Sequence, residues 1–186
     1  MATDQQHNIE HVREAIRKAF EDAPYPGDDG IINEKHCSEC YDVARGLKGV
    51  HWKQATLEHF NKHPVLFEGL PLLKPAGFRF FVPAYMILAL DHRGQPGVIQ
   101  ECIVGPLEPV FEPRSSFEYF IERVDPLTSV QKHAIRLFLE FSLARCVSRY
   151  EEGMGVKVRP EEVTQNPEAS PWGFIVEALD GYWGDK

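Results

Sequence analysis

The most apolar stretch of the chain runs from Pro71 to Asp91, with the sequence PLLKPAGFRFFVPAYMILALD. Apolar residues fill its flanks, so the pattern predicts a buried helix rather than a surface helix. Its large residues recur at the helical steps of three and four: Phe78, Phe81, Tyr85 and Leu88. Pro83 lacks a backbone N–H and clashes with the preceding turn, so we expect a kink or break there. The stretch should then form two helical pieces, roughly 75–82 and 83–92.

Helical stripes also precede this stretch. One helix is predicted to start near Asn8, with the inward positions Ile9, Val12, Ile16 and Phe20. A second helix is predicted from Asn33, which suits an N-cap, to about Gly46. Its apolar stripe consists of Cys37, Cys40, Tyr41, Ala44 and Leu47. Thr56 predicts the cap of a short helix that Pro64 ends.

The C-terminal half contains the clearest helix. Thr128 and Gln131 form a capping-box pattern that opens a long helix, running to about Tyr150. Residues 117–124 suggest a short helix or an edge segment. Residues 96–103 suggest a helix, although a short apolar run is also compatible with a strand. Ser170 and Pro171 restart a helix whose apolar stripe we expect to dock on the core: Trp172, Ile175, Val176, Leu179 and Trp183.

These elements predict an all-α fold. We expect one compact domain over residues 1–186, with about six to eight short helices around a Pro-kinked central helix pair and one long helix. Residues 1–7 and 153–166 are polar, and we expect them to be mobile.

Several motifs together resemble an uncharacterised bacterial family, one of the domains of unknown function. The central one is Phe78-Arg79-Phe80-Phe81-Val82-Pro83-Ala84-Tyr85. The others are the loop Ala23–Asp29, the segment His36-Cys37-Ser38-Glu39-Cys40, the helix entry Leu127–Gln131 and the terminal Ala178–Trp183. Where the family has Ser-Pro-Glu-Ala, this chain has Lys74-Pro75-Ala76-Gly77, which weakens the helix cap. The resemblance covers most of the chain. It implies a mostly helical fold and brings no activity with it.

Charge and cysteine content narrow the classes of function. The net charge of −8 disfavours binding to nucleic acid or to an anionic membrane surface, because both need basic residues. The N-terminus MATDQQHNIE lacks the apolar core of a signal peptide, so we expect a cytoplasmic protein. In that compartment the four cysteines suggest reduced thiols or a metal site rather than disulfides.

Two of the cysteines have the spacing of metal ligands. Cys37 and Cys40 are separated by two residues, and His59 and His63 by three, so the four side chains could hold zinc tetrahedrally. His36 and His51 are further candidate ligands. The alternative is that both cysteines face the core as small apolar residues. A thioredoxin-like pair would need a preceding strand and a helix N-terminus at the first cysteine, and the pattern predicts neither.

A second candidate region is the loop Ala23–Gly30, which contains two prolines and two glycines. Tyr25 could anchor a partner there. Asp28 and Asp29 could bind a cation or hold the turn. Arg79 stands in the apolar central stretch and could clamp an anion, reach the surface or pair with an aspartate of this loop.

The sequence thus leaves three hypotheses for function. The first is a protein-binding module, similar in kind to an immunity protein or antitoxin, that uses Tyr25, Asp28, Asp29 and Arg79. The second is a zinc-stabilised module built on Cys37, Cys40, His59 and His63, and no cofactor other than zinc is implied. The third is an enzyme using Asp28, Asp29 and Arg79, although the chain has no glycine-rich phosphate loop, Gly-x-Ser-x-Gly elbow or His-Glu-x-x-His helix.

Overall fold

A computed structural model describes residues 2–32, 37–91, 103–165, 167 and 170–184, and side chains from residue 8 onward. Within these ranges all regular structure is helical, which confirms the predicted all-α fold. The predicted helix at 96–103 lies largely outside the described residues. No helix in the described ranges is long and apolar enough to cross a membrane.

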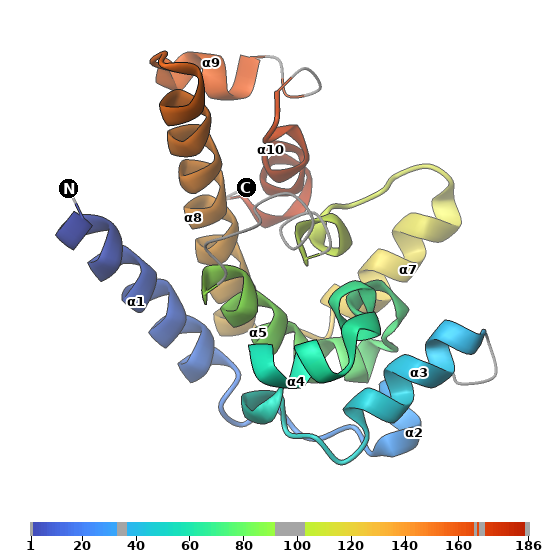
Figure 1. The fold of residues 1–186 in the computed structure, drawn as a ribbon. Coiled ribbons are helices and arrows are strands. Elements are labelled where there is room, and N and C mark those ends of the chain that lie inside the picture. Colours follow the sequence, from blue (N-terminus) through green and yellow to red (C-terminus); the bar gives the residue numbers. More distant parts are fainter. Residues whose placement is uncertain (1, 33–36, 92–102, 166, 168–169, 185–186) are drawn as a thin grey trace.

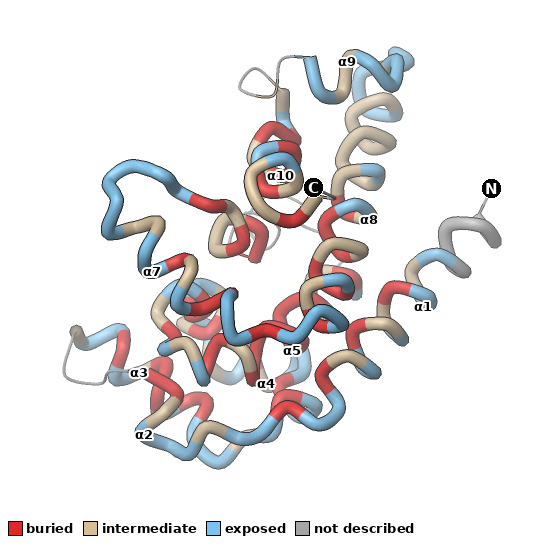
Figure 2. The backbone as a smooth tube through the Cα atoms, turned by 180° about the vertical axis from the view of Figure 1, so that it is seen from behind, coloured by how far each residue is buried: buried red, intermediate tan, exposed pale blue. Residues whose placement is uncertain are grey.

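Helix α5 (Pro75–Asp91) lies at the centre of the molecule and is buried over most of its length (Figures 1 and 2). The predicted break at Pro83 is absent, because Pro83 lies inside one continuous helix. A proline inside a helix costs about 3 kcal/mol. Burial of each large apolar side chain returns about 1.5–3 kcal/mol. Because Phe78, Phe81 and Tyr85 are all completely buried, packing outweighs the proline.

Helices α1 (Ala2–Ala19) and α8 (Ser129–Met154) pack against each other, and α1 also packs on α5. Arg13 of α1 forms an ion pair with Asp91 at the end of α5, with 2.7 Å between Nη2 and Oδ1. The predicted capping box of α8 is present: the Thr128 side chain accepts the Gln131 N–H at 3.2 Å, and the Gln131 side chain accepts the Thr128 N–H at 3.1 Å. The helix continues past Tyr150 to Met154, where Gly155 adopts the left-handed conformation.

Short helices cover the first half of α5 (Figure 1). They are α2 (Asp28–Ile31), α3 (Ser38–Leu47), α4 (Leu57–Lys62) and the 3-10 turns η1 (Trp52–Gln54), η2 (Pro64–Glu68) and η3 (Leu70–Leu72). The chain of Ile31 approaches α5 closely, since a Cβ atom on Gly77 would lie 2.3 Å from the Ile31 carbonyl oxygen. The same carbonyl oxygen accepts the Lys74 N–H at 2.9 Å.

Tyrosine side chains donate hydrogen bonds to carbonyl groups of the 3-10 segment, residues 64–73, which contains η2 and η3. Tyr85 of α5 donates its hydroxyl to the Leu66 carbonyl oxygen at 2.8 Å. The hydroxyl of Tyr119, on α7 (Arg114–Val124), lies 3.1 Å from the carbonyl oxygen of Pro71 and 3.0 Å from that of Leu73. The 3-10 segment is therefore fixed by α5 on one side and α7 on the other.

The C-terminal helices close the remaining side of the core. Here α9 (Pro160–Gln165) and α10 (Gly173–Ala178) are followed by a π-helical turn, η6 (Leu179–Trp183), which packs on α8. Trp172 and Trp183 are buried, as the stripe predicted. The Trp183 indole N–H donates to the Leu107 carbonyl oxygen of η4 (Gly105–Leu107) at 2.6 Å. Both segments predicted to be mobile contain helix, because α1 already begins at Ala2 and α9 lies within residues 153–166. Their mobility stays a prediction.

Candidate functional site

Helix α3 begins later than the sequence predicted. Its first residue is Ser38, and Asn33, the predicted cap, lies outside the described residues. Cys37 is the N-cap instead, with an extended backbone, and its Sγ accepts the Cys40 N–H at 3.2 Å. The sulfur therefore occupies the position that a serine or asparagine oxygen usually takes at a helix start. This correction places the first cysteine of the pair at a helix N-terminus.

The two sulfur atoms of the pair are in contact. Cys37 Sγ and Cys40 Sγ lie 2.9 Å apart, whereas a disulfide bond is about 2.05 Å long, and neither residue forms a disulfide. Cys37 is half-buried and Cys40 is buried. Burial raises the pKa of Cys40 to about 11, with a further contribution from its hydrogen bond to Cys37. The pair thus combines a half-buried cysteine with a buried one whose thiol stays protonated at neutral pH.

Tyr119 of α7 lies near Cys40, and Arg123 of the same helix contacts Tyr119. Burial raises the pKa of Tyr119, and the neighbouring Cys40 adds to the rise while Arg123 opposes it. The guanidinium carbon of Arg123 lies 4.5 Å from the centroid of the Tyr119 ring and 5.2 Å from that of Phe78. Arg123 is buried, and its Nε and Nη1 have no hydrogen-bond partner in the described part of the chain. Burial accordingly lowers the pKa of Arg123.

Sequence patterns did not single out Tyr119 or Arg123. For residues 117–124 the sequence predicted only that they form either a short helix or an edge segment. The available signal was their spacing, since an aromatic residue and an arginine four positions apart meet on one helix face. Nothing in the sequence indicated that this face would lie against residues of α5 and near Cys40.

The predicted histidine ligands lie away from the cysteines. His59 Nε2 is 2.8 Å from the carbonyl oxygen of Gly46, near the C-terminal end of α3, and the rings of His59 and His63 are 5.1 Å apart. Gly46 is six positions after Cys40 in α3, which corresponds to about 9 Å along the helix at 1.5 Å per residue. Among the described residues, no group of three or more His, Cys, Asp or Glu side chains is placed to hold a metal ion.

The structure therefore does not bring the four predicted zinc ligands together. Of the two further candidates, His51 accepts the Lys53 N–H at 3.1 Å and caps η1, while His36 lies outside the described residues.

The loop predicted to bind a partner is internally braced. The Tyr25 hydroxyl donates to Asp28 Oδ1 and accepts the Gly49 N–H at 2.9 Å. The Tyr25 ring meets Phe80 edge to face, with 5.3 Å between centroids. The Asp29 carbonyl oxygen accepts a hydrogen bond from Lys74 Nζ at 2.7 Å. These contacts give Tyr25 and Asp28 a structural role in holding the loop.

Arg79 does not join this loop. No hydrogen bond or ion pair connects it to Asp28 or Asp29 within the described residues, and its buried Nε has no hydrogen-bond partner there. The three residues of the enzyme hypothesis are therefore not linked by direct contacts.

Comparison with known proteins places the chain in a family without assigning a function. No curated protein and no solved structure matches it. Residues 8–153 match the family of unknown function DUF6714. The match spans the cysteine pair, α5, α7 and nearly all of α8, and it ends before α9 and α10. Because it covers well over half of the chain, this protein belongs to the family DUF6714.

Proposed function

We propose that Cys37 and Cys40 form a redox-active dithiol that undergoes thiol–disulfide exchange. The observation that carries the proposal is the position of Cys37 Sγ, which caps α3 and touches Cys40 Sγ at 2.9 Å. A helix N-terminus carries partial positive charge and favours an anion such as a thiolate. The sequence argued against a thioredoxin-like pair on two grounds, a missing helix start and a missing strand. The observed start of α3 removes the first, whereas the described residues contain no strand, so the proposed pair is not of the thioredoxin type.

The difference in burial assigns a role to each cysteine. Cys37 is the more accessible sulfur, so it is the one that attacks an incoming disulfide. Cys40 is buried, and the raised pKa keeps it a thiol until a mixed disulfide forms beside it. Because Cys40 is only 3% exposed, attack from solvent is directed to Cys37.

The exchange proceeds in two steps. The Cys37 thiolate attacks one sulfur of a disulfide substrate, whose S–S bond breaks, and the released thiolate takes a proton from water. Cys40 then loses its proton and attacks the Cys37 sulfur, which releases the second substrate thiol. Two protein thiols are thereby oxidised to one disulfide, and the substrate disulfide is reduced to two thiols.

The test is a redox titration in glutathione buffers, read by alkylation of free thiols and mass spectrometry. The protein should carry Cys102→Ser and Cys146→Ser so that only the pair reports. We expect one reversible two-electron transition. Oxidised glutathione should form a stable mixed disulfide with the further variant Cys40→Ser, on Cys37. The matched variant Cys37→Ser should accumulate far less adduct, because Cys40 is buried.

Two results would overturn the proposal. One is a pair that stays reduced across the whole range of glutathione potentials. The other is equal adduct formation on Cys37 and Cys40. Elemental analysis of the same sample addresses the zinc hypothesis, since one equivalent of zinc that is lost in the cysteine variants would favour a metal clamp instead. The protein-binding role suggested by the acidic composition stays a prediction.

A further inference from the structure

The first turn of α3 carries a carboxylate beside the dithiol. Glu39 stands between the two cysteines in the sequence Cys37-Ser38-Glu39-Cys40, and it is exposed. Because a chain spans at most about 3.6 Å per residue, the Cα atoms of Glu39 and Cys37 lie within about 7 Å of each other. This separation is shorter than the Debye length of about 10 Å at 0.1 M salt, so Glu39 acts on a charged group that approaches Cys37.

The charge of Glu39 is not balanced by a neighbour in the described part of the chain. Glu39 forms no ion pair there, and Arg45, the cation of the same helix, is paired with Asp42 at 2.8 Å. The charge is felt at the pair itself. After burial and the contact with Cys37, the Glu39 carboxylate adds to the raised pKa of Cys40. A carboxylate without a counter-ion therefore stands next to the sulfur that meets the substrate.

The charges of α7 do not reverse this sign. Burial raises the pKa of Tyr119, Arg123 opposes the rise, and Cys40 and the exposed Glu122 add to it. Arg123 itself is only 6% exposed, and Cys40 makes no contribution to its pKa, which burial lowers. The exposed charges described near the pair, Glu39 and Glu122, are therefore both negative.

We propose that Glu39 makes the dithiol prefer disulfides that carry positive charge close to their sulfur atoms. This inference rests on the dithiol function proposed above and names its substrate class. An ammonium or guanidinium group near the attacked sulfur is attracted to Glu39 as the substrate approaches Cys37, whereas a carboxylate is repelled. The two exchange steps and their products are unchanged, and the charge of the substrate alters the rate of the first step.

The experiment compares three small disulfides that differ in charge: cystamine, hydroxyethyl disulfide and dithiodipropionate. They carry two ammonium groups, no charge and two carboxylates, respectively. The reduced protein with Cys102→Ser and Cys146→Ser is mixed with each disulfide, and alkylation with mass spectrometry follows the oxidation of the pair over time. Each rate constant is divided by that of mercaptoethanol with the same disulfide, which removes the intrinsic reactivity of the probe.

We expect the normalised rate to fall in the order cystamine, hydroxyethyl disulfide, dithiodipropionate. Glu39→Gln should lower the ratio of the cystamine rate to the dithiodipropionate rate by about two- to twentyfold, because it removes one attraction and one repulsion between exposed charges. Raising the salt from 0.1 M to 1 M shortens the Debye length from about 10 Å to about 3 Å, so it should also lower this ratio.

Glu152→Gln is the matched control. It removes the same charge from an exposed position near the end of α8, and Figures 1 and 2 show this end far from α3. The control should leave the ratio unchanged. Circular dichroism melting checks that both variants fold, and if Glu39→Gln does not fold, the order of the three normalised rates on the parent protein decides.

The inference fails if the three normalised rates are equal, if dithiodipropionate reacts fastest, or if Glu39→Gln and Glu152→Gln give the same ratio. In each of these cases the oxidation of the pair still supports the dithiol function, and only the substrate class is lost. If none of the disulfides oxidises the pair, the dithiol function and the substrate class fail together.

Discussion

The close approach of Gly77 to Ile31 gives the sharpest prediction for stability. In an exposed helix, replacing glycine by alanine stabilises by about 1 kcal/mol through helix propensity. At Gly77 the new Cβ would lie 2.3 Å from the Ile31 carbonyl oxygen, 2.9 Å from its Cα and 3.0 Å from its carbonyl carbon. All three are backbone atoms, so no side chain can turn away to make room. We expect Gly77→Ala to destabilise the protein.

The magnitude follows from two opposing effects. Overpacking a core costs about 1–3 kcal/mol, and a clash with backbone alone belongs at the upper end. Subtracting about 1 kcal/mol for propensity leaves a net loss of about 2 kcal/mol. The backbone shift would also break the hydrogen bond from the Lys74 N–H to the Ile31 carbonyl oxygen, which is 2.9 Å long.

Urea denaturation followed by circular dichroism measures this loss as a lower midpoint at unchanged slope. Gly153→Ala is the matched control, because Gly153 lies inside α8 and a Cβ there would meet no atom within 4 Å. That control should be as stable as the wild-type protein or more stable. A Gly77→Ala variant that matched or exceeded the stability of the wild-type protein would refute the inferred backbone contact.

Two further predictions concern pH and helix capping. Burial, and to a lesser extent the neighbouring Glu177, raises the pKa of Glu108 from its ordinary 4.5 to about 7. The folded protein therefore holds this proton more tightly than the unfolded chain, and the stability that Glu108 contributes is fully present below pH 4.5 and lost as the pH rises through 7. The free energy of unfolding of the wild-type protein should therefore fall between pH 5 and 8 relative to Glu108→Gln, and parallel pH curves of the two proteins would contradict this assignment. Thr128→Ala removes the acceptor for the Gln131 N–H and should cost about 1 kcal/mol in urea denaturation, while Thr128→Ser should retain most of the stability.

Local chemistry explains which parts of the fold were predictable. The start of α8 was predicted correctly because Thr128 and Gln131 satisfy each other's backbone groups within four residues. The start of α3 was not, because Asn33 has the stronger capping side chain and the cap formed by Cys37 depends on where the preceding chain turns. The continuity of α5 through Pro83 also depended on distant packing, which residue patterns do not encode.

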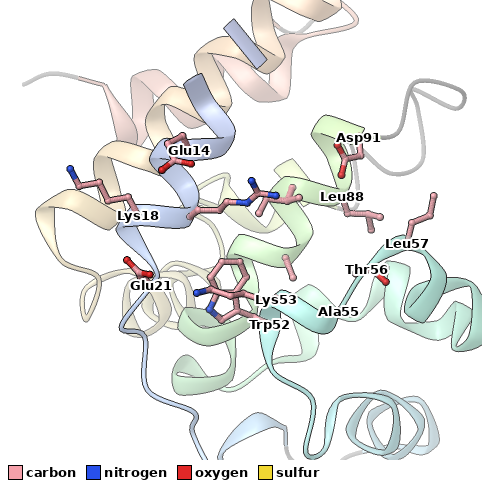
Figure 3. A pocket seen from close by; sticks show the side chains of 13 residues that line it. Glu14, Lys18, Glu21, Trp52, Lys53, Ala55, Thr56, Leu57, Leu88 and Asp91 are labelled. Atoms are coloured by element: carbon pink, nitrogen blue, oxygen red, sulfur yellow. The ribbon is translucent and has the colours of Figure 1, made fainter. Parts of the chain in front are cut away.

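The candidate sites show the same division. The spacing of Cys37 and Cys40 was visible in the sequence, but their chemistry depended on the helix boundary between them. A pocket lined by the end of α1, residues 52–57 and α5 could not be predicted from the sequence, because these three segments are far apart along the chain (Figure 3). No local sequence pattern indicates that α1 and α5 leave a pocket beside Trp52.

The two tyrosines that bond the 3-10 segment couple its motions to the rest of the molecule. Its amides would exchange with solvent readily if residues 64–73 were an independent surface loop. However, Tyr85 and Tyr119 hold carbonyl groups at both ends of the segment, and they belong to α5 and α7. We therefore expect residues 64–73 to open together with those helices as one cooperative unit, so that hydrogen exchange of their amides should show the opening free energy of the helix contacts rather than that of a loop.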